Sequence, residues 1–106
     1  MSVLHVALAK IDQSALRQTK EEAFEEIRKI IATIPVAKRD VRVGSPLNAS
    51  TTRGYDIALT MIFDDYDTFR AYLAHPKHLE LLKRFGPALR EMISYQIDGP
   101  GTKAKL

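Results

Sequence analysis

The stretch "GYDIALTMIFDDYDTFRAYLAHPKHLELL", residues 54–82, predicts the central part of the fold. Apolar and mixed residues alternate through residues 54–63, as in a β-strand with one buried face. Acidic residues then open a helical segment over residues 64–74, because negative charge favours a helix N-terminus. Pro76 disfavours helical geometry at His75 but suits the first turn of a second helix. The stretch therefore predicts a strand, a helix, a corner and another helix in succession.

The remaining elements follow from similar periodicities. Residues 3–10, 39–45 and 91–98 alternate like strands. Apolar residues three to four apart predict one long amphipathic helix over residues 14–34, with Ser14 as its N-cap. The order β-α-β-β-α-α-β is that of an α+β, ferredoxin-like fold, in which an antiparallel sheet carries its helices on one face.

The composition narrows the class of protein. The chain has 106 residues, including 16 Lys or Arg, 13 Asp or Glu and no cysteine. One domain is expected over residues 3–98, followed by a flexible basic tail over residues 99–106. Because the basic residues are scattered, nucleic acid is not expected as a partner. No apolar run reaches the ~20 residues that span a bilayer, so no membrane association is expected. The N-terminus alternates like a strand and lacks the features of a signal peptide. The absence of cysteine fits an intracellular protein, so a cytoplasmic location is expected.

The first predicted strand is apolar on both faces. Leu4, Val6 and Leu8 point to one side, and His5 lies among the residues that point to the other. The helices can cover only one face of the sheet. An apolar face that the chain does not cover predicts a homodimer packed through that face.

Four segments together resemble a known family. They are "LHVALAK" (4–10), "IP" (34–35), "RGYDIALTMIFDDYDTFRAYLAHPKH" (53–78) and "LREMISYQID" (89–98). The third is the most specific, because it combines Gly-Tyr at a strand start with Tyr-x-x-His-Pro-x-His at the corner. The chain resembles the stress-responsive dimeric α/β-barrel (Dabb) family over residues 3–98. The resemblance implies a homodimer whose two four-stranded sheets close into one barrel.

A plant member of this family closes a linear polyketide by an aldol condensation, and the chain is similar to it almost without a shift in register. The resemblance implies that His78 is a catalytic base, Tyr72 its partner at the substrate carbonyl and His5 a pocket histidine. It also implies a substrate pocket lined by His5, Ala9, Ala23, Phe24, Ile27, Ile57 and Leu59. The plant enzyme's own substrate is not implied, because four of these positions carry other side chains in that enzyme. These positions are Ala9, Ala23, Ile27 and Ile57.

The physical chemistry of the corner fits such a reaction. A carbon acid needs a base that is neutral near pH 7 and a donor aimed at the developing oxyanion. His78 would lie in the first turn after Pro76, where the positive end of the helix dipole lowers its pKa. The alternative is that His78, Tyr72 and His5 are packed structural residues with no chemical role. His75, as the residue before proline, is expected to be structural.

Other kinds of site have weaker support. His75 and His78 could share a metal ion, but with a proline between them they do not lie on the same face of one helix. Typical zinc sites also need at least three protein ligands. A serine triad is not supported, because no G-x-S-x-G sequence is present. We therefore expect no metal and no cofactor, although the sequence does not decide whether an ion binds near His75 and His78.

Two functions remain from the sequence. The first is a cofactor-free polyketide cyclase-like enzyme that closes a linear poly-β-keto chain, acting on an apolar or anionic small molecule. The second is a non-catalytic, stress-responsive or small-molecule-binding homodimer. A cavity that reaches His78 would favour the first function, and a tightly filled interior would exclude it.

Overall fold

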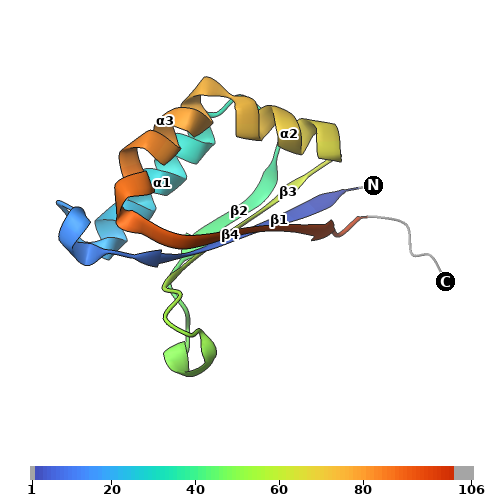
Figure 1. Cartoon of the computed structure of the whole chain (residues 1–106). Helices are drawn as coiled ribbons and strands as arrows, with labels where there is room; N and C mark the ends of the chain where they lie inside the picture. The colour runs from blue at the N-terminus through green and yellow to red at the C-terminus, as the bar shows by residue number, and fades with distance from the viewer. Residues whose placement is uncertain (1, 102–106) are drawn as a thin grey trace.

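The computed structural model describes residues 2–101 and has the predicted ferredoxin-like arrangement (Figure 1). The strands are β1 (Val3–Ile11), β2 (Arg39–Gly44), β3 (Ile57–Phe63) and β4 (Leu89–Asp98). The helices are α1 (Lys20–Thr33), α2 (Tyr66–Ala74) and α3 (Pro76–Phe85). Three short 3-10 turns complete the chain: η1 (Gln13–Ala15), η2 (Ala49–Thr51) and η3 (Gly86–Ala88).

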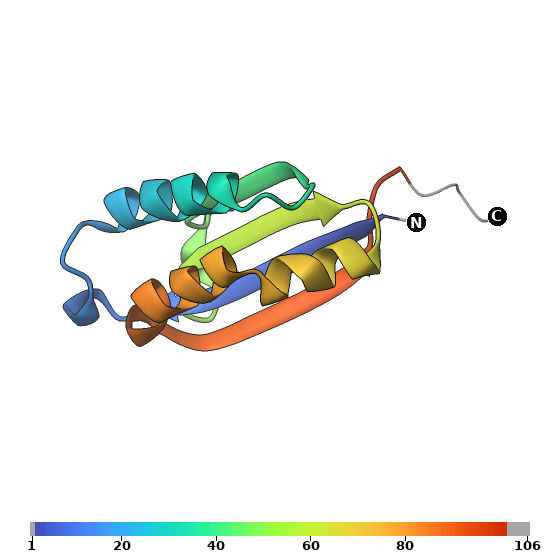
Figure 2. The same ribbon diagram turned by 90° about the horizontal axis from the view of Figure 1, so that it is seen from above.

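The four strands form one antiparallel sheet in the order β2-β3-β1-β4. All three helices lie on the same face of the sheet, with α1 over the β2 side and α2 and α3 over the β1 side (Figure 2). In this register His5 of β1 lies opposite Met61 of β3 and Gln96 of β4. β4 is an edge strand, so one side of the helix-covered layer ends at β4 and α3.

The first helix is shorter than predicted, and Ser14 is not its N-cap. Thr19 caps α1 instead: its hydroxyl accepts the Glu22 amide, and the Glu22 carboxylate accepts the Thr19 amide. This capping box satisfies two backbone donors at the helix start. Ser14 lies inside the separate turn η1, where Asp12 is the cap. The stronger T-x-x-E signal therefore decides where the helix begins.

The third and fourth strands also begin at other residues than predicted. β3 begins at Ile57, because Arg53 (φ 54°) and Gly54 (φ 87°) form a turn with left-handed backbone. β4 begins at Leu89 and passes through a bulge, where Glu91 (φ 48°) and Met92 lie opposite the single residue Ala9. A bulge redirects the side chains of the strand that carries it.

The predicted corner lies between α2 and α3. His75 is extended (φ −66°, ψ 137°), and it is both the C-cap of α2 and the N-cap of α3. Its Nδ1 accepts the backbone N–H of Lys77 at 3.1 Å. Pro76 occupies the first helical position of α3, where its missing N–H costs nothing. The conformation predicted for His75 is confirmed.

The sheet has a covered and an uncovered face. Between sheet and helices lies a core that includes Ile31, Met61, Phe63 and Phe69. The opposite face carries an apolar row from β1 and β4, which we call the outer patch: Leu4, Val6, Tyr95 and Ile97. Tyr95 and Ile97 are 62% and 49% exposed. Leu8, which was expected on this face, also lines the cavity described below.

The first two residues of the predicted tail are held against the sheet. Gly99 donates its N–H to Ser2 O, and Pro100 O accepts hydrogen bonds from Ser2 and Arg39. The flexibility predicted for residues 99–106 stays a prediction, because these hydrogen bonds involve only Gly99 and Pro100 and residues 102–106 lie outside the described part. Within residues 2–101, none of the helices has the length and apolar character required to cross a membrane.

Candidate functional site

Tyr72 lies in the last turn of α2 with its side chain fully buried. Its ring packs against His78 at a centroid distance of 4.7 Å and against Phe63 at 5.1 Å. Among residues 2–101 its hydroxyl has no hydrogen-bond partner. A buried hydroxyl left unpaired costs about 1–3 kcal/mol, and the chain itself supplies no group that removes this cost among the described residues. Burial also raises the pKa of Tyr72, which keeps the hydroxyl protonated as a donor.

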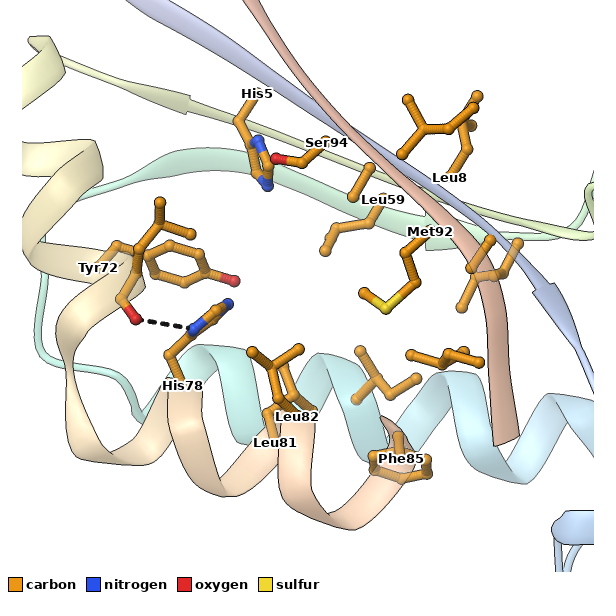
Figure 3. Close-up of a pocket in the computed structure, with 17 residues that line it drawn as sticks. His5, Leu8, Leu59, Tyr72, His78, Leu81, Leu82, Phe85, Met92 and Ser94 are labelled. Atoms are coloured by element: carbon orange, nitrogen blue, oxygen red, sulfur yellow. Dashed lines mark hydrogen bonds between the residues drawn. The ribbon is translucent and has the colours of Figure 1, made fainter. Parts of the chain in front are cut away.

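His78 lies in the first turn of α3 and is fixed by its Nδ1 atom. This atom lies 3.0 Å from the backbone O of Leu73. Because a carbonyl oxygen can only accept, Nδ1 carries the proton, and the neutral ring leaves a lone pair on Nε2. Figure 3 shows the His78 ring beside Tyr72 at one end of the cavity. His78 therefore presents an acceptor there.

His5 enters the same region from β1. Its Nδ1 lies 3.1 Å from the amide nitrogen of Gln96, and its ring lies 4.8 Å from that of Phe69 and 6.4 Å from that of Tyr72. Burial first, and the charge on His78 second, lower the pKa of His5 to about 4. The ring is therefore neutral at pH 7.

The pKa of His78 is lowered as predicted, but from a different physical cause. Burial of the ring lowers this pKa, while the hydrogen bond to Leu73 O opposes the effect. The predicted cause was the helix dipole. Desolvation acts in the same direction, because it disfavours the charged imidazolium.

A cavity of about 230 Å³ lies between α3, β1 and β4, with His5, Tyr72 and His78 at one end (Figure 3). We call these three side chains the polar end. The rest of the lining is almost entirely apolar: Ala7, Leu8, Ala9, Ile27, Ile57, Leu59, Leu73, Leu81, Leu82, Phe85, Leu89, Met92, Ile93 and Ser94. Among the described residues, no Lys, Arg, Asp or Glu belongs to this lining.

The structure brings together most of the residues expected in the pocket: His5, Ala9, Ile27, Ile57 and Leu59 line the cavity with Tyr72 and His78. Ala23 and Phe24, which were also expected in the pocket, are not among the residues that line the cavity. Both are buried in the core on α1, 3% and 5% exposed. The reason is that α1 lies over the β2 side of the sheet (Figure 2), so within this helix only Ile27 reaches the cavity.

Sequence reasoning missed the contributions of α3 and β4. Leu81, Leu82 and Phe85 follow His78 at spacings of three, four and seven residues, which is the signature of one helical face. This signal was present in the sequence. Met92 and Leu89 both reach the cavity although they are three residues apart on one strand, because the bulge changes the alternation between them.

The metal site considered at the corner lacks ligands. Within residues 2–101 no three His, Asp or Glu side chains are grouped closely enough to hold an ion. His75 Nδ1 is engaged with the Lys77 N–H, and His78 Nδ1 with Leu73 O.

Comparison with known proteins identifies the family. The model of the stress responsive A/B barrel domain (Dabb) matches residues 3–98. The chain belongs to this family. The resemblance seen in the sequence is thereby confirmed. A search of curated proteins finds no match.

Solved structures share the Dabb fold at low identity. A Bacteroides fragilis protein, described as dimeric, ferredoxin-like and of unknown function, is 24% identical (TM-score 0.72; 92% of this chain, 96% of that chain). A protein from Arabidopsis thaliana is 21% identical (TM-score 0.79; 98% and 99%). A hydroxynitrile lyase from Passiflora edulis is 19% identical (TM-score 0.77; 97% and 97%). The fold therefore occurs in an enzyme and in proteins without an assigned activity.

We expect the free energy of unfolding to fall as the pH drops from 6.5 toward 4. The folded pKa values of His5 and His78 are lowered, so in this window the unfolded chain binds protons that the folded chain does not. The loss approaches about 1 kcal/mol per pH unit for His5. Urea unfolding of the parent and of His5→Asn at several pH values measures this pH dependence, which should be smaller in His5→Asn. Equal pH dependence of the two proteins would contradict this origin.

Proposed function

We propose that this Dabb protein is a cofactor-free enzyme that forms a carbon–carbon bond next to a carbonyl group, by aldol-type ring closure of a linear poly-β-keto substrate. The observation that carries the proposal is the unpaired hydroxyl of Tyr72, buried beside the unprotonated Nε2 of His78. An acceptor and a donor that face one apolar cavity are what a carbon acid requires.

The first step is the removal of a proton. His78 Nε2 accepts a proton from a carbon between two carbonyl groups, and the electron pair of the broken C–H bond moves onto a carbonyl oxygen. The resulting enolate oxygen accepts a hydrogen bond from the Tyr72 hydroxyl. Because the hydroxyl is already buried and unpaired, it need not break another hydrogen bond to do so.

The second step closes the ring. The enolate carbon attacks another carbonyl carbon of the same chain, and one carbon–carbon bond forms. The alkoxide produced takes back the proton from His78, which returns to its neutral state. No electrons are gained or lost overall, so these residues need no redox partner.

The cavity favours a small, neutral reacting portion. An apolar cavity of 150 Å³ holds benzene, so by proportion 230 Å³ holds roughly nine non-hydrogen atoms. An anionic substrate, which the sequence left open, would meet no cationic side chain in the described lining. Leu82 and Met92, 36% and 51% exposed, lie where a longer chain or a carrier group could leave the cavity between α3 and β4.

Cleavage of a small hydroxynitrile is the second candidate. The Passiflora edulis neighbour is named as a hydroxynitrile lyase. The cavity volume favours this candidate, since it is below the ~300 Å³ at which pockets for drug-sized ligands begin. The same base would remove the hydroxyl proton, a carbonyl group would form, and cyanide would leave with the electron pair of the broken carbon–carbon bond. Cyanide would then take the proton from His78 and depart as hydrogen cyanide.

We also propose that the protein acts as a homodimer, in the cytoplasm. The outer patch is apolar, and none of the described helices covers it (Figure 1). Burial of such a patch against a second copy fits the dimeric state described for the Bacteroides fragilis neighbour.

Substitutions at the corner should separate chemistry from structure. His78→Ala should lower turnover of a linear poly-β-ketone thioester by roughly 10²–10⁴-fold, because it removes the base. Tyr72→Phe should have a smaller effect, mainly on kcat, because it removes only the hydroxyl. His75→Ala should reduce stability more than turnover, since its side chain caps α3.

The controls are thermal unfolding of each variant and a parallel assay with a small cyanohydrin. Cyanohydrin cleavage that depends on His78, without ring closure, would replace the first candidate by the second. If the protein binds either substrate but turns over neither, both enzymatic candidates are excluded and the non-catalytic, small-molecule-binding function is supported. A His78→Ala protein that turns over at the parent rate would refute the assignment of the base.

Dimerisation can be tested with lysine substitutions at two exposed tyrosines, one inside and one outside the outer patch. Sedimentation of the parent at micromolar concentration should give twice the mass of one chain. Tyr95→Lys should shift the protein toward the monomer, because it places a charge in the outer patch. Tyr66→Lys, at an exposed tyrosine on α2, should not. A parent protein that sediments as a monomer would contradict the proposed dimer.

A further inference from the structure

A polar group that the proposed reaction does not yet use lies behind the polar end of the cavity. Gln96 of β4 is opposite His5 in the sheet register and is half-buried. Its amide nitrogen lies 3.1 Å from His5 Nδ1 and 2.9 Å from Ser94 Oγ. Nearly all other side chains around the cavity are apolar, so this short chain of contacts marks a built feature.

The chemistry of the amide decides the state of the histidine. The Gln96 amide turns its nitrogen toward the ring, and because an amide nitrogen donates and cannot accept, His5 Nδ1 is the acceptor in this orientation. A neutral imidazole carries one proton, which then lies on Nε2. The ring is neutral at pH 7, because burial and the neighbouring His78 lower its pKa to about 4. Contact with the Phe69 ring at 4.8 Å restricts reorientation of the imidazole.

We propose that Gln96 is a positioning residue that holds His5 as the Nε2-protonated tautomer, so that His5 acts as a second hydrogen-bond donor to the oxyanion. The catalytic part of this inference rests on the proposed function. His5 and His78 then have opposite tautomers: Leu73 O holds the proton of His78 on Nδ1, and Gln96 leaves that of His5 on Nε2. The polar end thus presents one base and two donors.

The opposite tautomer would change the site. His5 Nε2 would then be a second acceptor, and only Tyr72 would remain to stabilise an oxyanion. Loss of one such donor typically lowers kcat by about 10²–10³-fold. The identity of residue 96 therefore matters to the reaction although its side chain is outside the cavity lining.

The tautomer can be measured without any substrate. In ¹⁵N spectra of the histidine rings at pH 7, the parent should show a protonated Nε2 and a bare Nδ1 for His5. Gln96→Glu should place a proton on Nδ1, because a carboxylate only accepts. Gln96→Met should allow both tautomers of His5, because the methionine side chain has no hydrogen-bond donor and no acceptor as strong as the amide of Gln96. Gln13→Glu makes the same chemical change at an exposed position far along the chain and should leave His5 as in the parent.

Activity provides the second measurement. Gln96→Glu should lower kcat by about 10²-fold, with a smaller change in KM and with the dimer and fold retained. A parent His5 that carries its proton on Nδ1, or a Gln96→Glu protein that keeps a bare Nδ1, would overturn the role of Gln96. If both spectra are as expected but neither substrate is turned over, the proposed reaction fails and the control of the tautomer stands.

Discussion

The corner at His75 and Pro76 is the constraint on which the site depends. Pro76 has no N–H to continue α2, and the Lys77 N–H is taken by His75 Nδ1. In a continuous helix this N–H would bond to Leu73 O, four residues earlier. Leu73 O is therefore free, and it accepts the Nδ1–H of His78 instead. One break in the helix thus brings His78 beside Tyr72 and fixes which nitrogen of its ring is unprotonated.

The sheet supplies the other half of the site. The register of β1 with β4 places His5 opposite Gln96, and the bulge at Glu91 turns Met92 toward the cavity. α1 and β2 contribute little to the cavity beyond Ile27. The cavity therefore lies over β1, β3 and β4, under α2 and α3, and no residue of β2 lines it.

Local features could be predicted from the sequence, and features set by distant pairing could not. The effect of Pro76 on its neighbours is local, so the corner, both helices around it and the position of His78 were all predictable. The start of α1 was also predictable, because the capping box of Thr19 and Glu22 is a local sequence motif, but Ser14 was predicted as the N-cap instead. Ala23 and Phe24 lie in the core and not at the cavity, and no local pattern shows this, because the side of the sheet that α1 covers depends on packing between remote elements. The partnership of His5 with Gln96 joins residues 91 positions apart, and no local pattern encodes it.

The site has a cost in stability that a purely structural corner would not need. An unpaired buried hydroxyl weakens the folded state by about 1–3 kcal/mol, and the two buried histidines weaken it as the pH falls below about 6.5. Phenylalanine at position 72 would keep the ring contacts and avoid that cost. Residues that weaken a fold are typical of sites that bind or react.

Hydrogen–deuterium exchange on a carbon acid tests the central claim most directly, because it does not require knowledge of the natural substrate. Phenylacetone, a small neutral ketone, would be incubated with the protein in D₂O, and loss of its α-proton signal would be followed by NMR. If His78 Nε2 is a base that faces a donor across an apolar cavity, the parent should accelerate exchange above the buffer rate. His78→Gln should return it to that rate. Exchange at the buffer rate with the parent, or equal acceleration by His78→Gln, would contradict the account.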